Sequence, residues 1–406
     1  MPTLLQRLAG LAGVRPRAAQ PLAAEVKQSA VGPLIAMQYQ RQPVWTPRDY
    51  GSFAREGYAQ NPVVYRCIRM IAEAAASVPI DLFAGSAEIE DHPLLDLLRA
   101  PNPMQSRPEF LESFYGFLLV AGNSYAEAVG VGGALRELYV LRPDRITILP
   151  GTDGWPLGYD YTVNGNTVSL SGEAVPGVRK VLHQQMFHPA NDYYGLSPVE
   201  AAATAIDIHN AASAWNKAML DNSALPSGAL VFNAGDRQLT PEQYQRLKAE
   251  LEQSFQGAKN AGRPMLLEGG LDWRAMSMTP KDMDFIESKR QAARDIATAL
   301  GVPPMLLGIP GDLTHANFAE ANRSFWRHTI LPLTNRSLQA LSGWLGPAYG
   351  GGLELRADLD AVEALSPERD ALWSRVNAAS FLSGAEKRAA VGYGADETPA
   401  EDAGEA

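Results

Sequence analysis

The sequence predicts an α+β fold, because strand-like and helix-like segments occupy different parts of the chain. Between residues 123 and 187, aromatic and β-branched residues alternate with polar ones, and glycine turns separate the runs. Most of the C-terminal half instead carries helix-start signals and apolar residues at helical spacing. The length of 406 residues suggests about two or three domains, and the 46% of hydrophobic residues can supply their cores.

The first predicted elements are one helix and a strand-rich block. Within the block, a glycine turn separates two strand-like runs, which is typical of a β-hairpin. The alternation of Tyr159, Tyr161 and Val163 leads into Asn164 and Gly165, a pair that favours a tight hairpin turn. The helix is expected over residues 61–76, and the first hairpin over 125–129 and 135–141.

Helix starts are marked by capping residues. A Ser or Thr at the N-cap with an acid or amide three residues later satisfies two free backbone amides, and each cap adds about 1 kcal/mol. Ser366 is a candidate cap without that partner. The segments that match or approach the pattern are 106–109, 197–200, 240–243, 279–282 and 383–386. The elements expected nearby are an alanine-rich helix from Pro198 to about Ala224, strands over 228–232 and 264–267, and a short helix over 241–256.

A strongly marked helix over residues 280–300 ends at an apolar elbow, residues 301–308, which is the most informative feature of the chain. Gly301 suits the left-handed position that closes many helices, and Pro303 and Pro304 cannot continue one. The apolar face of this helix is expected to hold Met283, Ile286, Ala293, Ile296, Ala297 and Leu300.

A second long helix is predicted after the elbow, from residue 317 to about 345. Pro332 lies inside it and cannot donate a helical hydrogen bond, so a kink is expected near His328 or Thr329. Because nothing around the elbow supplies a nucleophile, a metal cluster or a phosphate cradle, this region suggests a mechanical role.

Charge and cysteine content exclude several classes of protein. With 35 basic and 45 acidic residues the net charge is −10, so any DNA contact must be local. The single cysteine, Cys67, cannot form an internal disulfide and is expected to be a small buried residue on a helix. No run reaches the roughly 18 apolar residues of a membrane span, and the N-terminal residues lack a signal-peptide pattern. Residues 15–47 are expected to form a flexible arm, and the acidic end after Ala395 a second loose segment.

Signatures of enzymes are missing, and no cofactor or metal is predicted. The segment 257–264 has Arg263 and Pro264 where a phosphate-binding loop needs Lys and Ser or Thr. The six histidines show no His-Glu-x-x-His pairing. The segment 195–197 lacks the second glycine of a nucleophile elbow.

Many short motifs follow one another along residues 50 to 395. Each alone has an ordinary structural explanation, such as a turn followed by a helix start. They are 61–68, 92–95, 101–103, 122–125, 141–145, 195–198, the elbow, 314–317 and 325–332. Their order resembles that in the portal proteins of tailed phages and of phage-derived gene-transfer particles. One departure lies at 314–317, where relatives often have an aromatic residue beside the threonine.

The resemblance implies a portal fold with a β-rich wing, two stem helices, an α/β clip, a long kinked helix and a short helical crown. The implied limits are an N-terminal arm at 1–47, the wing at 48–196, the first stem helix at 197–224, the clip at 225–279, the second stem helix at 280–302, the tunnel loop at 303–316, the kinked wing helix and its return at 317–365, and the crown with the acidic tail at 366–406. Such a protein forms a ring of about twelve subunits at one capsid vertex.

The resemblance also implies a channel for packaging and ejecting double-stranded DNA, independent of its sequence. An acidic subunit suits this passage, because a channel rich in phosphate contacts would hold the duplex. The implied partners are the terminase large subunit, the major capsid protein and a head–tail adaptor, with no membrane. The implied location is the virion, after assembly in the host bacterial cytoplasm. Two alternatives stay open: another non-catalytic head–tail collar ring, and a hydrolase with a triad from distant segments.

The candidate functional residues fall into three groups. A DNA channel or stem interface would contain Lys281, Asp284, Lys289, Arg290 and Arg294. Within this group we favour ion pairing with a neighbouring subunit over phosphate contact, because such charges usually decorate solvated or interfacial helix faces. The tunnel loop would contain Ile309, Gly311, Asp312, Leu313, Thr314 and His315, and the elbow Gly301, Pro303 and Pro304.

Overall fold

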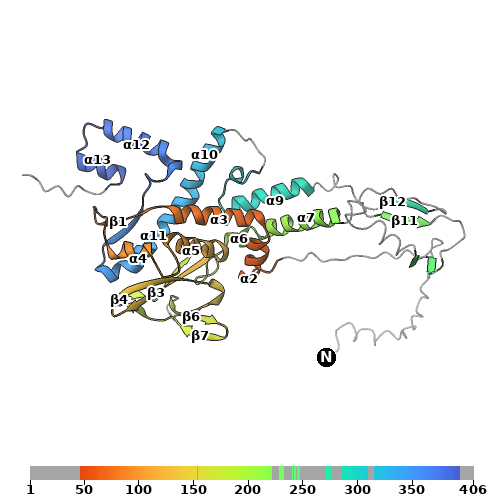
Figure 1. Cartoon of the computed structure of the whole chain (residues 1–406), viewed down its shortest axis with the longest axis horizontal. Coiled ribbons are helices and arrows are strands. Elements are labelled where there is room, and N and C mark those ends of the chain that lie inside the picture. Colours follow the sequence, from red (N-terminus) through yellow and green to blue (C-terminus); the bar gives the residue numbers. More distant parts are fainter. Residues whose placement is uncertain are drawn as a thin grey trace, which may run out of the picture. The chain divides into compact units, whose positions relative to one another are not determined.

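The computed structural model describes residues 46–152, 154–221, 228–232, 240, 242–243, 245–246, 271–275, 285–309 and 315–393. Contacts divide the chain into Met1–Val44 and Trp45–Ala406, and every described residue belongs to the second unit. This unit combines helices with antiparallel sheets, which confirms the predicted α+β class (Figure 1). The predicted arm up to residue 45, the strand over 264–267 and the cap at 279–282 lie outside the described residues.

Helix α3 (Pro62–Ser77) lies in the main hydrophobic core, where the sequence predicts the first helix. Asn61 caps its start, because its side-chain Oδ1 accepts hydrogen bonds from the amides of Val63, at 3.0 Å, and Val64, at 3.2 Å. Its buried face packs against α5 (Arg107–Ala121). Cys67 belongs to this face and is fully buried, as predicted. The buried residues of α3 are Val64, Cys67, Ile68, Ile71, Ala72, Ala75 and Ala76.

Antiparallel strands follow α5 and confirm the predicted strand-rich block. Both residues of the predicted tight turn have positive φ, 51° at Asn164 and 81° at Gly165. A small second core lies in this block, formed by Tyr125, Leu141, Ile146, Ile148, Leu170 and Val181. One sheet joins β3 (Asn123–Val131), β4 (Ala134–Leu141) and β10 (Val181–Gln185), a second joins β5 (Ile146–Pro150), β6 (Pro156–Val163) and β7 (Asn166–Ser169), and β8 (Glu173–Val175) pairs with β9 (Val178–Arg179).

A third sheet brings distant parts of the chain together. Strand β1 (Ile80–Ala84) pairs with β2 (Ala87–Ile89) on one edge and with β13 (Leu353–Ala357) on the other. Helix α4 (Pro93–Arg99) follows β2. Helix α11 (Leu331–Leu345) contacts both β13 and β10, so it connects this sheet to the strand-rich block.

Two of the predicted helices are interrupted. The helix expected from Pro198 to about Ala224 divides into α6 (Pro198–Ala201) and α7 (Ala203–Asp221), because Ala202 has a ψ of only −3°. The helix expected from residue 317 to about 345 consists of α10 (His315–Phe325), a π-helical turn (Trp326–Ile330) and α11. This turn contains His328 and Thr329, so the irregularity lies where the sequence predicts a kink. Pro332 occupies the first turn of α11, where its missing amide is tolerated.

Some local predictions are confirmed and others need correction. Thr240 Oγ1 accepts from the Gln243 amide at 3.3 Å, and Gln243 Oε1 accepts in return at 3.0 Å, which completes a capping box. Ser366 is not an N-cap, because a 3-10 turn runs directly into the helix and Ser366 already has helical backbone angles. Capping boxes also form at 106–109 and 383–386. Strand β11 (Gly228–Phe232) is confirmed, but its partner β12 (Leu271–Ala275) was not predicted.

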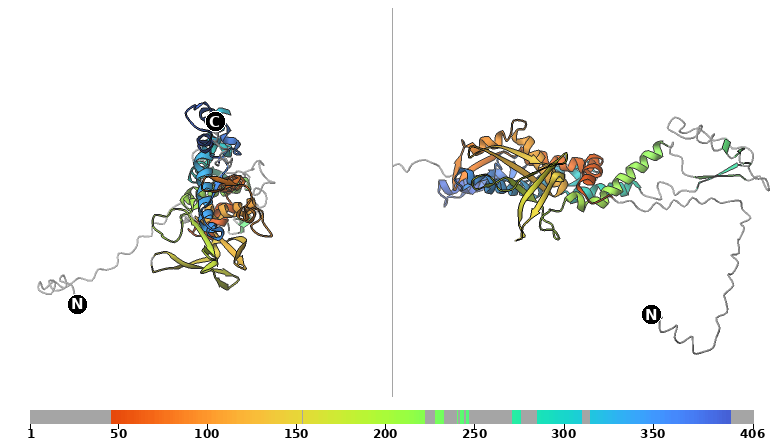
Figure 2. Two further views of the ribbon diagram at one scale, coloured as in Figure 1. Left: turned by 90° about the vertical axis from the view of Figure 1, so that its left-hand side faces the viewer. Right: turned by 90° about the horizontal axis from the view of Figure 1, so that it is seen from below.

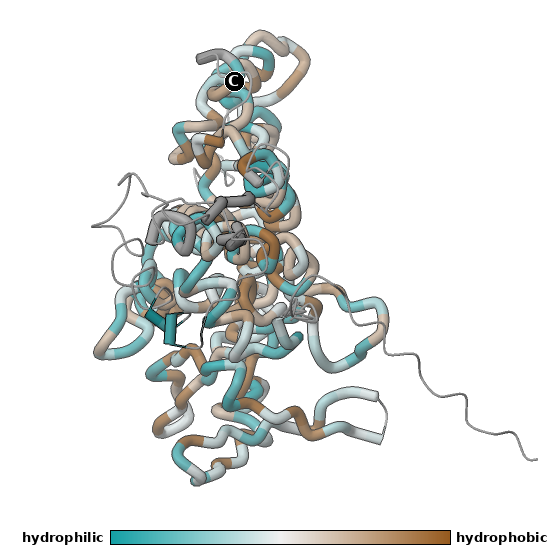
Figure 3. Tube along the Cα trace, turned by 90° about the vertical axis from the view of Figure 1, so that its right-hand side faces the viewer, coloured by the Kyte–Doolittle hydropathy of each residue, from teal (hydrophilic) through white to brown (hydrophobic). Residues whose placement is uncertain are grey.

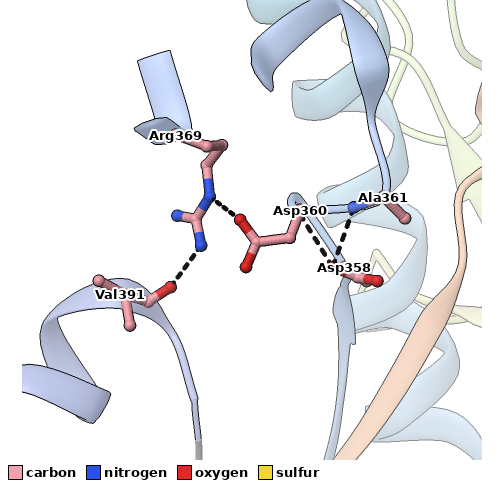
Figure 4. Close-up of polar contacts among 5 residues, drawn as sticks. All are labelled: Asp358, Asp360, Ala361, Arg369 and Val391. Atoms are coloured by element: carbon pink, nitrogen blue, oxygen red, sulfur yellow. Dashed lines mark hydrogen bonds and ion pairs between the residues drawn. The ribbon is translucent and has the colours of Figure 1, made fainter. Parts of the chain in front are cut away.

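The C-terminal helices α12 (Ser366–Ala378) and α13 (Gly384–Val391) are attached largely by polar contacts, because each buries a single residue. Hydrophilic and hydrophobic residues alternate along the trace near this end of the described region (Figure 3). Arg369 on α12 joins the Asp360 carboxylate through Nε and donates through Nη2 to the Val391 carbonyl at 2.6 Å (Figure 4). The Arg369 hydrogen bond lowers the pKa of the Asp360 carboxyl. Arg369 therefore connects the end of α13 to the segment after β13.

Candidate functional site at helix α9 and the elbow

Helix α9 (Phe285–Ala299) packs against α7. The two helices run side by side (Figure 1 and Figure 2). Three of the five buried residues of α9 and its end are alanines, and short side chains allow helix backbones to approach closely. Ile286 differs from the prediction, because it is 65% exposed although it was placed on the apolar face. The buried residues of α9 and its end are Ala292, Ala293, Ile296, Ala297 and Leu300.

The opposite face of α9 is polar and carries two contacts within the helix. Arg290 Nη1 is 3.6 Å from Glu287 Oε2, and both side chains are more than half exposed. Gln291 Nε2 donates to Asp295 Oδ1 at 2.8 Å. Such exposed pairs contribute about 0–1 kcal/mol, so the charges of this face can exchange partners at low cost.

The five charged candidates are only partly placed by the structure. Lys289, Arg290 and Arg294 lie on α9, whereas Lys281 and Asp284 are outside the described residues. The Arg294 carbonyl accepts a hydrogen bond from Thr298 Oγ1 at 2.9 Å. The interface and phosphate roles of these residues remain predictions.

A buried polar contact connects α7 to the start of α3. Asn61 Nδ2 donates to Asn210 Oδ1 at 2.9 Å and lies 3.2 Å from His209 Nδ1. Because Oδ1 of Asn61 already accepts two amide hydrogens, its nitrogen must face His209, whose Nδ1 is then the unprotonated acceptor. Burial lowers the pKa of His209, and the nearby Lys289 charge lowers it further. An unprotonated Nδ1 leaves the imidazole neutral in this contact.

The elbow begins with a Schellman motif at Gly301. The glycine has the predicted left-handed backbone, with φ +72°. The Gly301 amide donates to the Thr298 carbonyl at 3.0 Å, and the Val302 amide to the Ala297 carbonyl at 2.8 Å. Thr329 Oγ1 donates to the Gly301 carbonyl at 2.5 Å. The end of α9 is thus joined to the π-helical turn, a contact that the sequence did not predict.

The rest of the elbow is compact. A 3-10 helix (Pro304–Leu307) follows Pro303 and ends at Gly308, with φ +71°. Leu306 and Leu307 are partly buried against the main core. Of the predicted tunnel-loop residues, Ile309 is half-buried and His315 begins α10, while Gly311, Asp312, Leu313 and Thr314 lie outside the described residues.

Two motifs that are distant in the sequence meet backbone to backbone. A Cβ atom on Gly122 would lie 2.5 Å from the Gly195 carbonyl oxygen, and one on Gly195 would lie 2.2 Å from the Gly122 carbonyl oxygen. Such distances leave no room for a side chain at either position. Ser197 completes the contact, because its Oγ donates to the Val120 carbonyl at 2.8 Å and accepts from the Val199 amide, in the first turn of α6, at 3.0 Å. Both motifs are visible in the sequence, but their contact cannot be inferred from it.

Asn123 stabilises this contact and determines which ring nitrogen of His183 is protonated. Its Nδ2 donates to the carbonyls of Ala121, at 2.9 Å, and Gly195, at 3.3 Å, so its Oδ1 faces the Gly195 amide and His183 Nε2. His183 therefore carries its proton on Nε2. Its ring stacks on Tyr125, with centroids 4.4 Å apart. Burial lowers the pKa of His183 to about 4, so the ring is neutral at pH 7.

Nothing in the described part of the chain suggests a metal centre. No group of three or more His, Cys, Asp or Glu side chains is positioned there to hold a metal ion. None of the described helices combines the length and the apolar character that crossing a membrane requires.

Residues 62–392 match the family model described as phage portal protein. The chain is similar to a chain in the neck of an empty gene transfer agent (GTA) particle solved with C6 symmetry, with 53% identity, TM-score 0.69, and coverage of 88% of this chain and 96% of that one. It is likewise similar to a chain in the neck of the native GTA particle solved with C12 symmetry, with 52% identity, TM-score 0.66, and coverage of 87% and 96%. The portal protein of Enterobacteria phage HK97 is 25% identical over 76% of this chain and 72% of its own length.

Proposed function

Because the chain belongs to the phage portal protein family, we propose that it forms a homo-oligomeric ring of about twelve subunits at one vertex of a capsid. The observation that carries this proposal is the high identity to the neck chain of the gene transfer agent particle, over nearly the whole of that chain. The C6 and C12 symmetry of those neck structures supports a ring here.

The ring would be a channel for packaging and ejecting double-stranded DNA without reading its sequence. The net charge of −10 supports this role, because an acidic subunit limits the number of phosphate contacts and lets the duplex move. The proposed partners are the terminase large subunit, the major capsid protein and a head–tail adaptor. The proposed location is the capsid portal vertex of a virion or transfer particle assembled in the bacterial cytoplasm. No catalytic step or cofactor is part of this proposal.

The α7–α9 pair is the proposed stem. Its first helix would extend over 197–224 and its second over 280–302, with the clip at 225–279 between them. The wing would cover 48–196 and 317–365, the tunnel loop 303–316 and the crown 366–406, after an arm at 1–47. We propose that the polar face of α9, with Lys289, Arg290 and Arg294, contacts the next subunit. The exposed Arg290–Glu287 pair supports this, because a weak pair within one helix is easily replaced by one between subunits.

The mass of the purified oligomer tests the ring. Twelve copies of a 43.8 kDa chain give about 526 kDa, measurable by native mass spectrometry, and negative-stain images should show a central hole. A monomer at every concentration, with no incorporation at a particle vertex, would refute the proposal. A ring without affinity for the terminase would favour a collar protein, and a compact active monomer would favour a hydrolase.

Two variants separate the roles of the stem and the loop. Arg290→Gln with Arg294→Gln should weaken ring assembly more than packaging, whereas intact rings with lost packaging would place these residues on DNA. Deleting residues 311–315 should leave the rings intact and impair packaging or DNA retention. Normal particles from the deletion variant would exclude a role for the tunnel loop.

A further inference from the structure

Buried polar atoms without a hydrogen-bond partner gather at one place in the fold. Among the described residues, the fully buried side-chain atoms that lack a partner are Tyr115 Oη, Ser124 Oγ, Gln184 Oε1 and Thr334 Oγ1. They come from α5, β3, β10 and α11, and each of these residues is at most 5% exposed. Buried polar groups nearly always have a partner, so four such atoms on neighbouring elements indicate a bonding group that they share.

The residues that carry these atoms are neighbours around Ser337 on α11. Ser337 Oγ accepts from Gln184 Nε2 at 2.9 Å. Thr334 lies one turn earlier on the same face of α11. Burial raises the pKa of Tyr115 to about 12, and the Ser337 and Thr334 side chains oppose that rise as hydrogen-bonding neighbours, although neither is aligned well enough to satisfy Tyr115 Oη. Ser124 is directly opposite Gln184 in the β3–β10 pairing, so both side chains share one face of the sheet.

The hydroxyl of Ser337 determines how the Gln184 amide is oriented. Ser337 Oγ donates its only proton to the Leu333 carbonyl at 3.0 Å, so towards Gln184 it can only accept. The amide must therefore present its nitrogen to Ser337. Its oxygen is then left to accept from another group, and the hydroxyls of Tyr115, Ser124 and Thr334 can each donate one hydrogen bond and accept others.

We propose that a buried water molecule occupies the space between these four atoms, in a hydration site built by α5, the β10–β3 strand pair and α11. A water molecule has two protons and two lone pairs, so it can donate to Gln184 Oε1 and bond the three hydroxyls at the same time. Buried waters typically make about three hydrogen bonds, within a range of two to four, to groups that are otherwise unsatisfied.

A metal cation matches the site less well than water does. Hard cations take six or more oxygen ligands, usually including carboxylates, and this site offers three hydroxyls and one amide oxygen without any charge.

The consequence for the fold is local. Helix α11 is joined to the strand-rich block at this point through a bound solvent molecule in addition to direct contacts.

Structure determination of the full-length protein or its assembled ring, at a resolution that shows ordered solvent, tests the site directly. We expect one density peak about 2.6–3.2 Å from Gln184 Oε1 and from at least two of the three hydroxyl oxygens. Four side chains bonded directly to one another, with no peak between them, would overturn the proposal. A peak whose occupancy depends on added sodium or potassium would overturn the assignment to water.

The sign of a stability change provides a second test. If water is bound, Thr334→Val deletes one of its partners and should lower the melting temperature of the full-length chain by about 2 °C. If the site is dry, the same change removes an unpaired hydroxyl and should leave the melting temperature unchanged or raise it. Thr204→Val is the matched control, because Thr204 is exposed on α7, and it should shift the melting temperature by less than about 1 °C.

Combining two substitutions tests whether the residues share the water. Ser124→Ala alone should also lower the melting temperature, because it removes another partner. In the Thr334→Val background its effect should be less than half as large, since the water is already weakened there. Fully additive effects would show that the two hydroxyls do not bind the same molecule.

Discussion

Gly301 offers a direct test of how α9 and the π-helical turn are joined. A Cβ atom at this position would lie 3.0 Å from Thr329 Oγ1 and 3.4 Å from Thr329 Cγ2, while the backbone φ is +72°. Gly301→Ala therefore adds two costs: a left-handed backbone at a residue with a side chain, and crowding against Thr329. The first is about 1–2 kcal/mol, and the second about 1 kcal/mol or more because Thr329 is held by its own hydrogen bond.

Gly308→Ala separates these two costs. Gly308 has nearly the same backbone, with φ +71°, but nothing lies within 4 Å of its added Cβ atom. We expect Gly308→Ala to show the backbone cost alone. Thermal unfolding followed by circular dichroism should therefore place the melting temperature of the Gly301→Ala variant about 2–4 °C below that of the Gly308→Ala variant.

Removal of the Thr329 side chain should abolish this difference. In a Thr329→Ala background the two crowding atoms are absent, so Gly301→Ala and Gly308→Ala should destabilise the protein equally. Equal effects of both substitutions already in the wild-type background would refute the reasoning. A difference that persists without the Thr329 side chain would place the crowding elsewhere.

Three other predictions concern buried or polar contacts. The pKa of His183 is about 4 in the folded chain and about 6.5 in the unfolded chain, so its contribution to stability is complete above pH 6.5 and declines as the pH falls towards 4. Urea unfolding should therefore show that the free energy of unfolding falls by up to about 2 kcal/mol between pH 7 and pH 5. The fall should be smaller in His183→Phe. An equal loss in that variant would show that other groups cause it. Arg369→Met should speed amide hydrogen exchange across residues 384–391, because it removes the contacts with Asp360 and Val391. Arg375→Met, at an exposed position of α12, is the control and should leave that exchange unchanged. Equal exchange in both variants would contradict the role of the Asp360–Arg369 contact. Burial raises the pKa of the Cys67 thiol to about 12, so a thiol-specific reagent at pH 8 should modify it only after denaturation, and rapid labelling of the native chain would disprove its burial.

Much of the local structure follows from the sequence alone. Asn61, the capping boxes and Gly301 act on amides or dihedral angles within a few residues, so their effect can be inferred without knowing the fold. The Asn164–Gly165 turn and the irregularity near His328 are local in the same sense. The order of motifs also indicated the family, because each motif reflects such a local requirement.

Other features required the tertiary structure. The exposure of Ile286 and the pairing of β11 with β12 depend on elements far away in the chain, and helical periodicity cannot show which part of an apolar face is covered. Ser366 fails as a cap because a preceding turn already supplies helical backbone.

The sequence by itself determined where helices and turns begin and end, because capping, proline and left-handed glycine act within a few residues. Only the tertiary structure decided that Gly122 meets Gly195, that Thr329 joins Gly301, and that four polar atoms from α5, β3, β10 and α11 are buried without a partner. These contacts link segments separated by tens to hundreds of residues. Their geometry depends on how several helices and sheets pack at once, which no short stretch of sequence encodes.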